Sequence, residues 1–448
     1  MTTKTMLLGC CTLLNAFTAG SQTISARLSK AIQELEADAQ MKHAVVSLMV
    51  ADAQTGKTVY AHNEQVGLAP ASSQKLFTSA AALEWLGKDY RYKTIIGYDG
   101  TLTNGVLNGN LYIKGFGDPT LGSWRWKETK PEVVLGKIVA ALPGKKINGN
   151  VFIDDSAFSI QPLPGGWIWD DIGNYYGAGS WAINWRENQY DMKLVPGKKE
   201  GDPTTIQSVT PAPIQNRITT GKKGSGDNGY IYLPPYSSSG FTQGTIPMGV
   251  NSFTISGAYP DGPAQLAQEL KQQLSVSGEY IIHYHHGGMQ HTLTTIYSPT
   301  LDSINYWFMR KSINLYGEAL LKTIAYEKTG FGSTEKGVEL LRSFWSERGI
   351  DKSAIKIMDG SGLSPQNRVT TDAEVKVLLY AKNRPWYNSF YHALPEYNGM
   401  KMKSGTIGGA KSFAGYHKQY VFSIIVNNFD GPAGEVVKKM YRVLDILK

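Results

Sequence analysis

A serine and a lysine three residues apart, Ser72 and Lys75, have the chemistry of a nucleophile and its base. They open an apolar helical run that ends near Gly87, and residues three apart in a helix lie on one face. Serine alone is a weak nucleophile, but a lysine amine desolvated in a cleft can accept its proton near neutral pH. The helix N-terminus adds N–H groups where an oxyanion would form. This pair predicts acyl transfer through a covalent intermediate.

A Ser-x-x-Lys spacing is short enough to arise by chance in a chain of 448 residues. A solvated helix start is therefore the alternative interpretation of Ser72 and Lys75. A second match, Ser353 with Lys356, leads into a predicted strand, where this spacing places the side chains on opposite faces. Other features of the chain are needed to distinguish a catalytic pair from a chance match.

Composition indicates a globular protein with room for two or three domains, since 42% of residues are hydrophobic and 18% are charged. The formal net charge is +8, but lysines and arginines are scattered among acids without a dense basic run. We therefore expect no nucleic-acid partner. We also expect no integral membrane span.

The first residues predict a signal peptide over 1–21. Lys4 precedes a short apolar segment, and small residues follow up to Ser21, where we expect cleavage. The segment Leu8-Gly9-Cys10 also resembles a bacterial lipoprotein box, which is the alternative. Cleavage after Ser21 removes both cysteines, so no disulfide or metal thiolate is expected. The prediction is a secreted protein that is periplasmic or associated with the cell envelope.

The segments around Ser72 predict a helix packed on an antiparallel sheet. A helix over 23–40 precedes a hairpin of strands 44–51 and 58–61. In the last third of the chain we expect four helices, over 300–310, 314–329, 337–349 and 372–381. A second hairpin over 412–427 and a closing helix over the final residues follow. The apolar stripe of the closing helix favours packing on the sheet over binding a membrane surface. The predicted fold class is α/β (α+β).

The middle of the chain has short strands punctuated by glycine. Residues 196–249, rich in Gly, Ser, Thr and Pro, predict a small inserted β domain III. Residues 91–195 and 250–289 would form an inserted domain II, and residues 22–90 and 290–448 one split domain. An aromatic loop over 166–177 is either a packed cluster or a wall of a cleft.

Two other patterns predict no site. Gly115 and Gly117 follow a strand, but Pro119 excludes a dinucleotide-binding loop. A predicted strand holds His283, His285 and His286 without an acidic ligand nearby in the sequence, so we expect no metal. No cofactor is expected.

Three motifs stand in one order: Ser72-x-x-Lys75, Ser312-Ile313-Asn314 and Lys403-Ser404-Gly405-Thr406. This set resembles the signature of penicillin-recognising serine enzymes. Over nearly the whole mature chain the sequence resembles class C low-molecular-mass penicillin-binding proteins, which are D-alanyl-D-alanine carboxypeptidases and endopeptidases. The resemblance extends to residues 117–121, 166–171 and 359–364 and to an insertion of roughly 180 residues after the first motif.

The resemblance implies a catalytic role for five residues. Ser72 attacks the carbonyl between two D-alanines, and Lys75 takes its proton. Ser312 relays a proton to the leaving amine, while Asn314 positions Lys75 and the substrate amide. Lys403 supplies a fixed positive charge toward the substrate carboxylate. Another Ser-x-Asn begins at Ser303, but we choose Ser312 because it follows Met309-Arg-Lys311 and precedes a helix.

The resemblance also implies substrate-binding residues. The hydroxyls of Ser404 and Thr406, which flank Gly405, bind the carboxylate, and the N–H groups of Ser72 and Thr406 form the oxyanion hole. Asp171 matches an aspartate that binds the amine of a diaminopimelate side chain, and Tyr176 lies in the same aromatic loop.

Two departures from the family pattern affect these assignments. The third motif has Ser404 where the family has threonine, which keeps the hydroxyl. The arginine that binds the diaminopimelate carboxylate is replaced by Pro365, with Arg368 nearby but not aligned.

The predicted function is a serine-type D-Ala-D-Ala carboxypeptidase and endopeptidase that acts on peptidoglycan stem peptides and is inhibited covalently by β-lactams. The alternatives are a β-lactamase, which the large insertion disfavours, and a non-catalytic wall-binding protein of the same fold.

Overall fold

The computed structural model describes residues 23–142 and 144–448. Its largest sheet is antiparallel and has the order β2-β1-β24-β23-β22-β21. The strands come from distant parts of the chain: β1 (Val45–Asp52), β2 (Thr58–His62), β21 (Glu396–Tyr397), β22 (Met400–Ile407), β23 (Ala410–His417) and β24 (Tyr420–Asn427). β1 is buried over six consecutive residues, from Val46 to Ala51, because helices cover both faces of the sheet.

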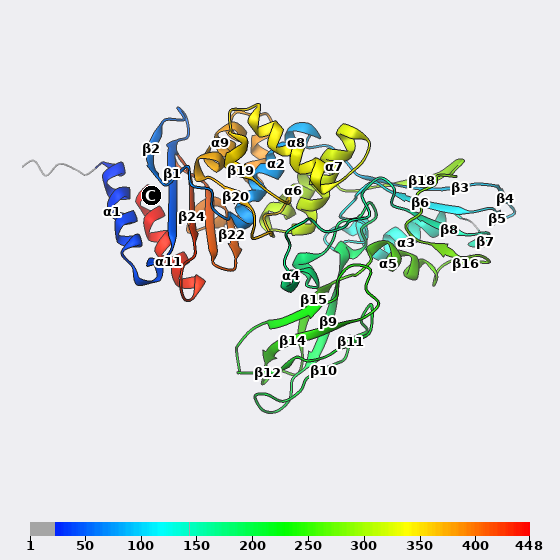
Figure 1. The fold of residues 1–448 in the computed structure, drawn as a ribbon. Helices are drawn as coiled ribbons and strands as arrows, with labels where there is room; N and C mark the ends of the chain where they lie inside the picture. The colour runs from blue at the N-terminus through cyan, green and yellow to red at the C-terminus, as the bar shows by residue number, and fades with distance from the viewer. Residues whose placement is uncertain (1–22, 143) are drawn as a thin grey trace, which may run out of the picture.

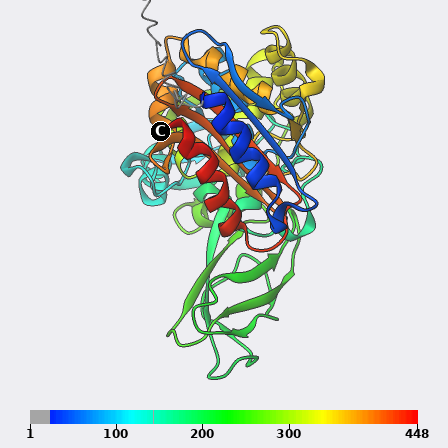
Figure 2. The same cartoon turned by 90° about the vertical axis from the view of Figure 1, so that its left-hand side faces the viewer.

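Two helices, α1 (Ile24–Glu36) and α11 (Ala433–Leu444), lie side by side on one face of this sheet (Figures 1 and 2). α1 buries Leu28, Ile32 and Leu35, whose spacing places them on one side of a helix. α11 buries Val436 and Met440 in the same apolar core. The predicted packing of the closing helix on the sheet is confirmed.

The other face of the sheet carries a helical layer around α2 (Lys75–Trp85), which follows a 3-10 turn at Ala71–Gln74. α2 is buried on all sides from Lys75 to Leu83, which explains its apolar sequence. The surrounding helices are α6 (Leu301–Arg310), α7 (Asn314–Thr329), α8 (Thr334–Ser346), α9 (Thr371–Lys382) and α10 (Tyr387–Ala393). The short α10 was not predicted from the sequence.

A second module has two sheets, of order β17-β8-β6-β3-β18 and β16-β7-β5-β4, that share an apolar core with α3 (Pro131–Ala140) and α5 (Gly262–Leu270). Its strands are β3 (Lys93–Tyr98), β4 (Thr101–Thr103), β5 (Val106–Asn108), β6 (Leu111–Gly115), β7 (Lys146–Asn148), β8 (Val151–Asp154), β16 (Ser275–Val276), β17 (Tyr280–Ile281) and β18 (His291–Tyr297). Because β18 pairs with β3, we propose that this module extends to residue 297.

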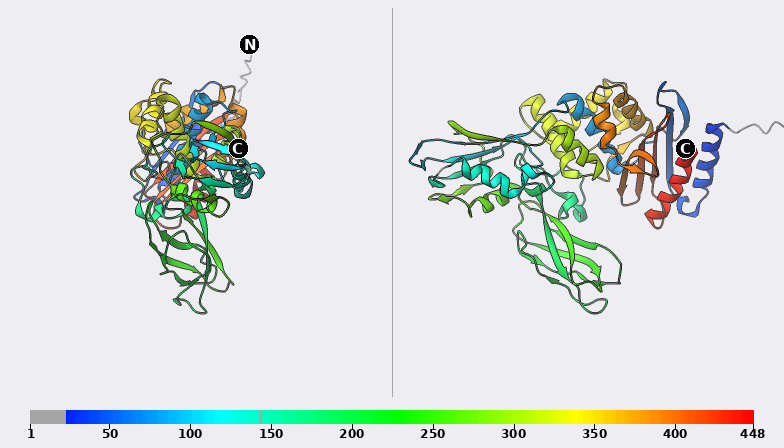
Figure 3. Two further views of the ribbon diagram at one scale, coloured as in Figure 1. Left: turned by 90° about the vertical axis from the view of Figure 1, so that its right-hand side faces the viewer. Right: turned by 180° about the vertical axis from the view of Figure 1, so that it is seen from behind.

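A third module projects from the place where the other two meet (Figures 1 and 3). Its strands are β9 (Gln189–Val195), β10 (Thr205–Ile206), β11 (Ile214–Gln215), β12 (Thr219–Gly221), β13 (Asn228–Tyr232), β14 (Gly240–Pro247) and β15 (Phe253–Ala258). β9 pairs with β15 and shares a core with β13 and β14. We therefore propose limits near residues 189 and 258, wider than the 196–249 expected from composition.

The strand predicted around His283, His285 and His286 is wrong, because β17 ends at Ile281 and the histidines lie in the following loop. The ring nitrogens of His283 lie 2.7 Å from Asp155 and 3.0 Å from Asp261. Burial opposes protonation, but the two carboxylates raise the pKa of His283 to about 9. Within residues 23–142 and 144–448, no group of three His, Cys, Asp or Glu side chains could hold a metal ion.

No helix in these same ranges is long and apolar enough to cross a membrane. The predicted signal peptide and both cysteines lie outside the described residues.

Candidate active site

Ser72 lies in the 3-10 turn directly before α2, and its Oγ accepts a hydrogen bond of 2.9 Å from Lys75 Nζ. Neither the turn nor the helix has a side-chain cap, so no side chain accepts from their first N–H groups. The Ser-x-x-Lys that begins at Ser353 is exposed: Ser353 is the middle residue of a 3-10 turn and Lys356 lies in β19 (Ile355–Lys356).

Two residues of the site, one next to Ser72 and one in the second motif, have a strained backbone. Ala71 has a φ of 49° and Ser312 a φ of 57°, both in the left-handed region. Such a conformation costs about 1–3 kcal/mol for a residue other than glycine and persists only where the surroundings hold it.

Lys75 is buried and its Nζ has three acceptors: Ser72 Oγ at 2.9 Å, Asn314 Oδ1 at 2.7 Å and the Ser361 carbonyl at 2.6 Å. Burial lowers the pKa of Lys75 to about 7, although the carboxyls of Asp359 and Glu318 raise it in part. A neutral amine is therefore accessible near neutral pH and can accept the Ser72 proton.

Ser312 and Asn314 lie where the loop after α6 enters α7. Ser312 Oγ accepts a hydrogen bond of 2.9 Å from Lys403 Nζ. Asn314 Nδ2 donates to the carbonyl of Tyr176 at 2.8 Å. The structure thus joins all three motifs, because Asn314 contacts Lys75 and Ser312 contacts Lys403.

The other Ser-x-Asn lies inside α6 and serves packing. Ser303 Oγ accepts from Trp126 Nε1 at 2.8 Å, and Asn305 Oδ1 accepts from Ser79 Oγ at 2.7 Å.

Lys403 lies on β22 with its side chain buried. Burial lowers its pKa well below the usual value, and the neighbouring Lys75 ammonium lowers it further. Burial and Lys75 thus both act against the positive charge expected for Lys403. A bound carboxylate would favour the protonated amine again.

Gly405 allows β22 to approach the nucleophile. A Cβ at this position would lie 2.3 Å from the carbonyl oxygen of Pro70 and 2.2 Å from Ser412 Oγ, so any side chain would push the strand away. Thr406 lines the cleft and accepts a hydrogen bond from Lys411 at 2.5 Å. Ser404 is half-buried. In the described part of the chain, it is not among the residues that line the cleft.

The cleft in front of Ser72 measures about 660 Å³ and lies between the large module and the aromatic loop. Asp171, in α4 (Trp169–Ile172), and Tyr176, in the 3-10 turn Tyr175–Gly177, line it together with Pro365. Burial and the neighbouring Asp170 raise the pKa of Asp171 to about 6. Arg368 instead donates to the carbonyls of Pro365 and Asn367 and is absent from the described cleft lining.

The D-Ala-D-Ala carboxypeptidase 3 (S13) family matches residues 28–445. This chain belongs to that family. It is a serine-type peptidase by that membership. It is 28% identical to a D-alanyl-D-alanine carboxypeptidase of an Actinomadura species, over 94% of this chain and 85% of that protein.

A second relative of this S13 peptidase is the D-alanyl-D-alanine carboxypeptidase DacB of Haemophilus influenzae, 27% identical over 72% of this chain and 68% of that protein. The crystal structure of penicillin-binding protein 4 from Haemophilus influenzae has the same fold, with a TM-score of 0.79 at 21% identity over 93% of this chain and 98% of that one.

Asp359 is a buried carboxylate of this S13 peptidase to which the sequence assigned no role. It accepts hydrogen bonds from the side chains of Gln74, Trp167 and Asn367, each 2.9 Å long. It also accepts the backbone N–H groups of Gly362 and Ser364. It therefore joins the turn before α2, the aromatic loop and its own glycine-rich loop, whose motif was the only sequence signal.

Glu374, in α9, is a second buried carboxyl that sequence reasoning missed. Ser73 Oγ and Ser423 Oγ each donate to it at 2.5 Å, and Ser412 Oγ lies 2.9 Å from Ser73 Oγ. Burial raises the pKa of Glu374 to about 7. These contacts hold the turn beside Ser72 against β23 and β24, and no local pattern of the sequence indicates them.

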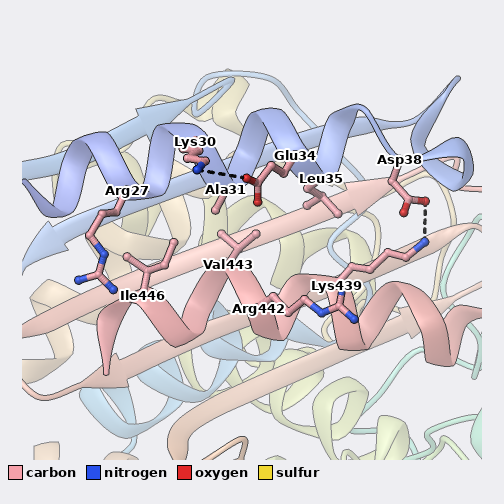
Figure 4. A pocket seen from close by; sticks show the side chains of 10 residues that line it. All are labelled: Arg27, Lys30, Ala31, Glu34, Leu35, Asp38, Lys439, Arg442, Val443 and Ile446. Carbon is pink, nitrogen blue, oxygen red and sulfur yellow. Dashed lines mark hydrogen bonds and ion pairs between the residues drawn. The ribbon is translucent and has the colours of Figure 1, made fainter. Parts of the chain in front are cut away.

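A separate groove lies between α1 and α11, on the face of the sheet opposite Ser72 (Figure 4). Lys439 Nζ lies 2.5 Å from Asp38 and Lys30 Nζ 3.8 Å from Glu34, so much of its charge is paired. It holds none of the three motifs and is not part of the active site.

Proposed function

We propose that this protein removes the terminal D-alanine from peptidoglycan stem peptides and cuts peptide cross-links through an acyl-enzyme on Ser72. The observation that carries the proposal is the 2.9 Å hydrogen bond between Ser72 Oγ and the buried amine of Lys75, whose pKa is lowered to about 7. A hydroxyl beside a neutral amine is activated for attack on a carbonyl.

The chemistry proceeds in two halves. Ser72 Oγ attacks the carbonyl between the two D-alanines while Lys75 takes its proton, and N–H groups of Ser72 and Thr406 stabilise the oxyanion. Ser312 gives its hydroxyl proton to the leaving amine, and the proton that Lys75 took from Ser72 returns to Ser312 through Lys403, its hydrogen-bond partner, so the amide bond breaks and an ester remains. Water then hydrolyses the ester, releases the shortened peptide and restores the Ser72 hydroxyl.

The substrate carboxylate provides the matching charge for Lys403. Thr406 lines the cleft. A substrate carboxylate bound between Thr406 and Lys403 forms charge-assisted hydrogen bonds. Asp171 faces the same cleft from the aromatic loop and would bind an amine on the acyl side of the substrate.

Intact mass measured after incubation with a penicillin tests this function. We expect one stable adduct that Ser72→Ala abolishes and that peptide mapping places on Ser72. An adduct on Ser353 or Ser361, or no adduct at all, would overturn the assignment and favour a non-catalytic wall-binding protein. Rapid loss of the adduct with release of hydrolysed penicillin would favour a β-lactamase.

We also propose that residues 1–21 direct the protein to the cell envelope, where its substrate lies. N-terminal sequencing of the mature protein is expected to begin at Gln22, and retention of Met1 would contradict export by cleavage.

A further inference from the structure

A second cavity lies behind the wall that bears the Ser-x-Asn motif. It measures about 420 Å³ and shares Tyr176, Ser312 and Asn314 with the cleft in front of Ser72. Lys311 and Arg125 also line it. Ser312 therefore contacts both spaces, one on each side of the loop.

Among the described residues that line this cavity, Lys311 is the one cation without an ion-pair partner. Arg125 is mostly buried and pairs with Glu187 through bonds of 2.8 and 3.0 Å. Glu187 also accepts from Ser123 and Tyr316, so this pair forms a fixed wall with little net charge. Lys311 is exposed at the end of α6 and has no ion-pair partner within the described ranges. Its ammonium is therefore available to an anionic ligand next to Ser312.

The cavity continues outward between the second and third modules. Gln189 of β9 and Ser256 of β15 line it and also line a third hollow, which contains Trp124 with 49% of its surface exposed. The three spaces are thus neighbours that share lining residues, and in this order they mark a path from Ser72 toward β9 and β15.

The direction of this path follows from the chemistry proposed for Ser312. The acyl half of the substrate occupies the cleft that Asp171 lines, and the leaving amine must reach Ser312 Oγ to receive a proton. The leaving group therefore lies on the Ser312 side. A released D-alanine is small, but the leaving half of a cross-link is a second stem peptide, which extends by about 3.3 Å per residue and bears carboxylates.

We propose that this path, from Lys311 to Ser256, binds the leaving stem peptide of a cross-linked substrate, with Lys311 as a partner for a carboxylate of that peptide other than the one bound by Lys403 and Thr406. The inference rests on the proposed peptidase function and assigns the endopeptidase reaction to a surface that cleavage of a terminal D-alanine does not need.

The test compares kcat/KM for a cross-linked muropeptide dimer and for a monomeric pentapeptide. Ser256→Trp fills the path at its far end, and Lys311→Ala removes the charge. For each variant we expect the ratio of dimer to monomer kcat/KM to fall roughly tenfold to a hundredfold, the scale of one charge-assisted hydrogen bond. Lys57→Ala removes a comparably exposed lysine in the turn after β1 and should leave the ratio unchanged.

An unchanged ratio in both variants, or equal losses on dimer and monomer, would overturn the inference. A different result would refute the proposed function itself: a wild-type protein that reacts with neither penicillin nor pentapeptide. The inference would then fail as well.

Discussion

Trp167 Nε1 donates a hydrogen bond of 2.9 Å to Oδ2 of the buried Asp359. Trp167 belongs to the aromatic loop that carries Asp171, whereas Asp359 also accepts from Gln74, which lies between Ser72 and Lys75 in the chain. One buried bond thus couples the wall that faces the substrate side chain to the turn that holds the nucleophile.

The first prediction concerns this bond. Trp167→Phe keeps an aromatic ring against Leu363 but leaves one oxygen of Asp359 without that donor, at a cost of about 1–3 kcal/mol in the free energy of unfolding. We expect a lower Tm and a higher KM, with a smaller change in kcat. Trp169→Phe is the matched control, because Trp169 is half exposed and stacks on Tyr232. Equal losses of stability in both variants would contradict the coupling.

The second prediction is the pH dependence of acylation. The pKa of Lys75 is lowered to about 7, and only the neutral amine can take the Ser72 proton. The rate of acylation by a penicillin should therefore fall about tenfold per pH unit below pH 7 and level off above it. Stopped-flow measurements between pH 5 and 9 check this, and a flat profile would mean that Lys75 is not the base.

The third prediction separates the two Ser-x-Asn pairs. Ser312→Ala and Asn314→Ala should slow acylation by about 10²–10⁴-fold, the range of acid–base contributions. Ser303→Ala and Asn305→Ala remove contacts to Trp126 and Ser79, so they should lower Tm while acylation per folded molecule stays the same. Equal kinetic losses in the two pairs would refute the choice of Ser312.

The fourth prediction concerns Asp171. Asp171→Ala should reduce kcat/KM roughly tenfold to a hundredfold for a stem peptide with a free side-chain amine, and little for one with an uncharged side chain. Burial and Asp170 raise the pKa of Asp171 to about 6, so the wild-type preference for the amine should disappear as the pH falls through 6. Asp170→Ala is the matched control at pH 8, where Asp171 is ionised with or without its neighbour; Asp170 itself accepts a hydrogen bond from Tyr232. A uniform loss across substrates would make Asp171 structural.

The fifth prediction follows from Pro365, which provides no guanidinium to the cleft. We expect kcat/KM values for diaminopimelate and lysine stem peptides to lie within about tenfold, because both present an amine and only one adds a carboxylate. A strong preference for diaminopimelate that Arg368→Ala removes would show that Arg368 leaves its present carbonyl partners when substrate binds.

The sequence predicted the family and the fold class because both depend on short motifs in a fixed order and on apolar periodicity. Ser72 and Lys75 meet through local helical spacing, so their contact could be predicted without the fold. Their catalytic roles, and those of Ser312, Asn314 and Lys403, stay predictions until the experiments above are made.

Contacts between distant segments could not be predicted in the same way. Glu374 lies some 300 residues from Ser73 and joins it only after β23, β24 and α9 have assembled. The carboxylates around His283 come from Asp155 and Asp261, and no local pattern predicts that they lie beside it. The lowered pKa of Lys403 has the same origin, because its burial and its approach to Lys75 are tertiary.

The pairing of β1 with β24 constrains the order of folding. β24 is made about 370 residues after β1, and it separates β1 from β23 in the sheet. The segment from β3 to β18 contains every partner of its own strands and can assemble while the rest of the chain is still being made. The turn that carries Ser72 instead packs against β22 and β23, so we expect peptidase activity only after these late strands have joined the sheet.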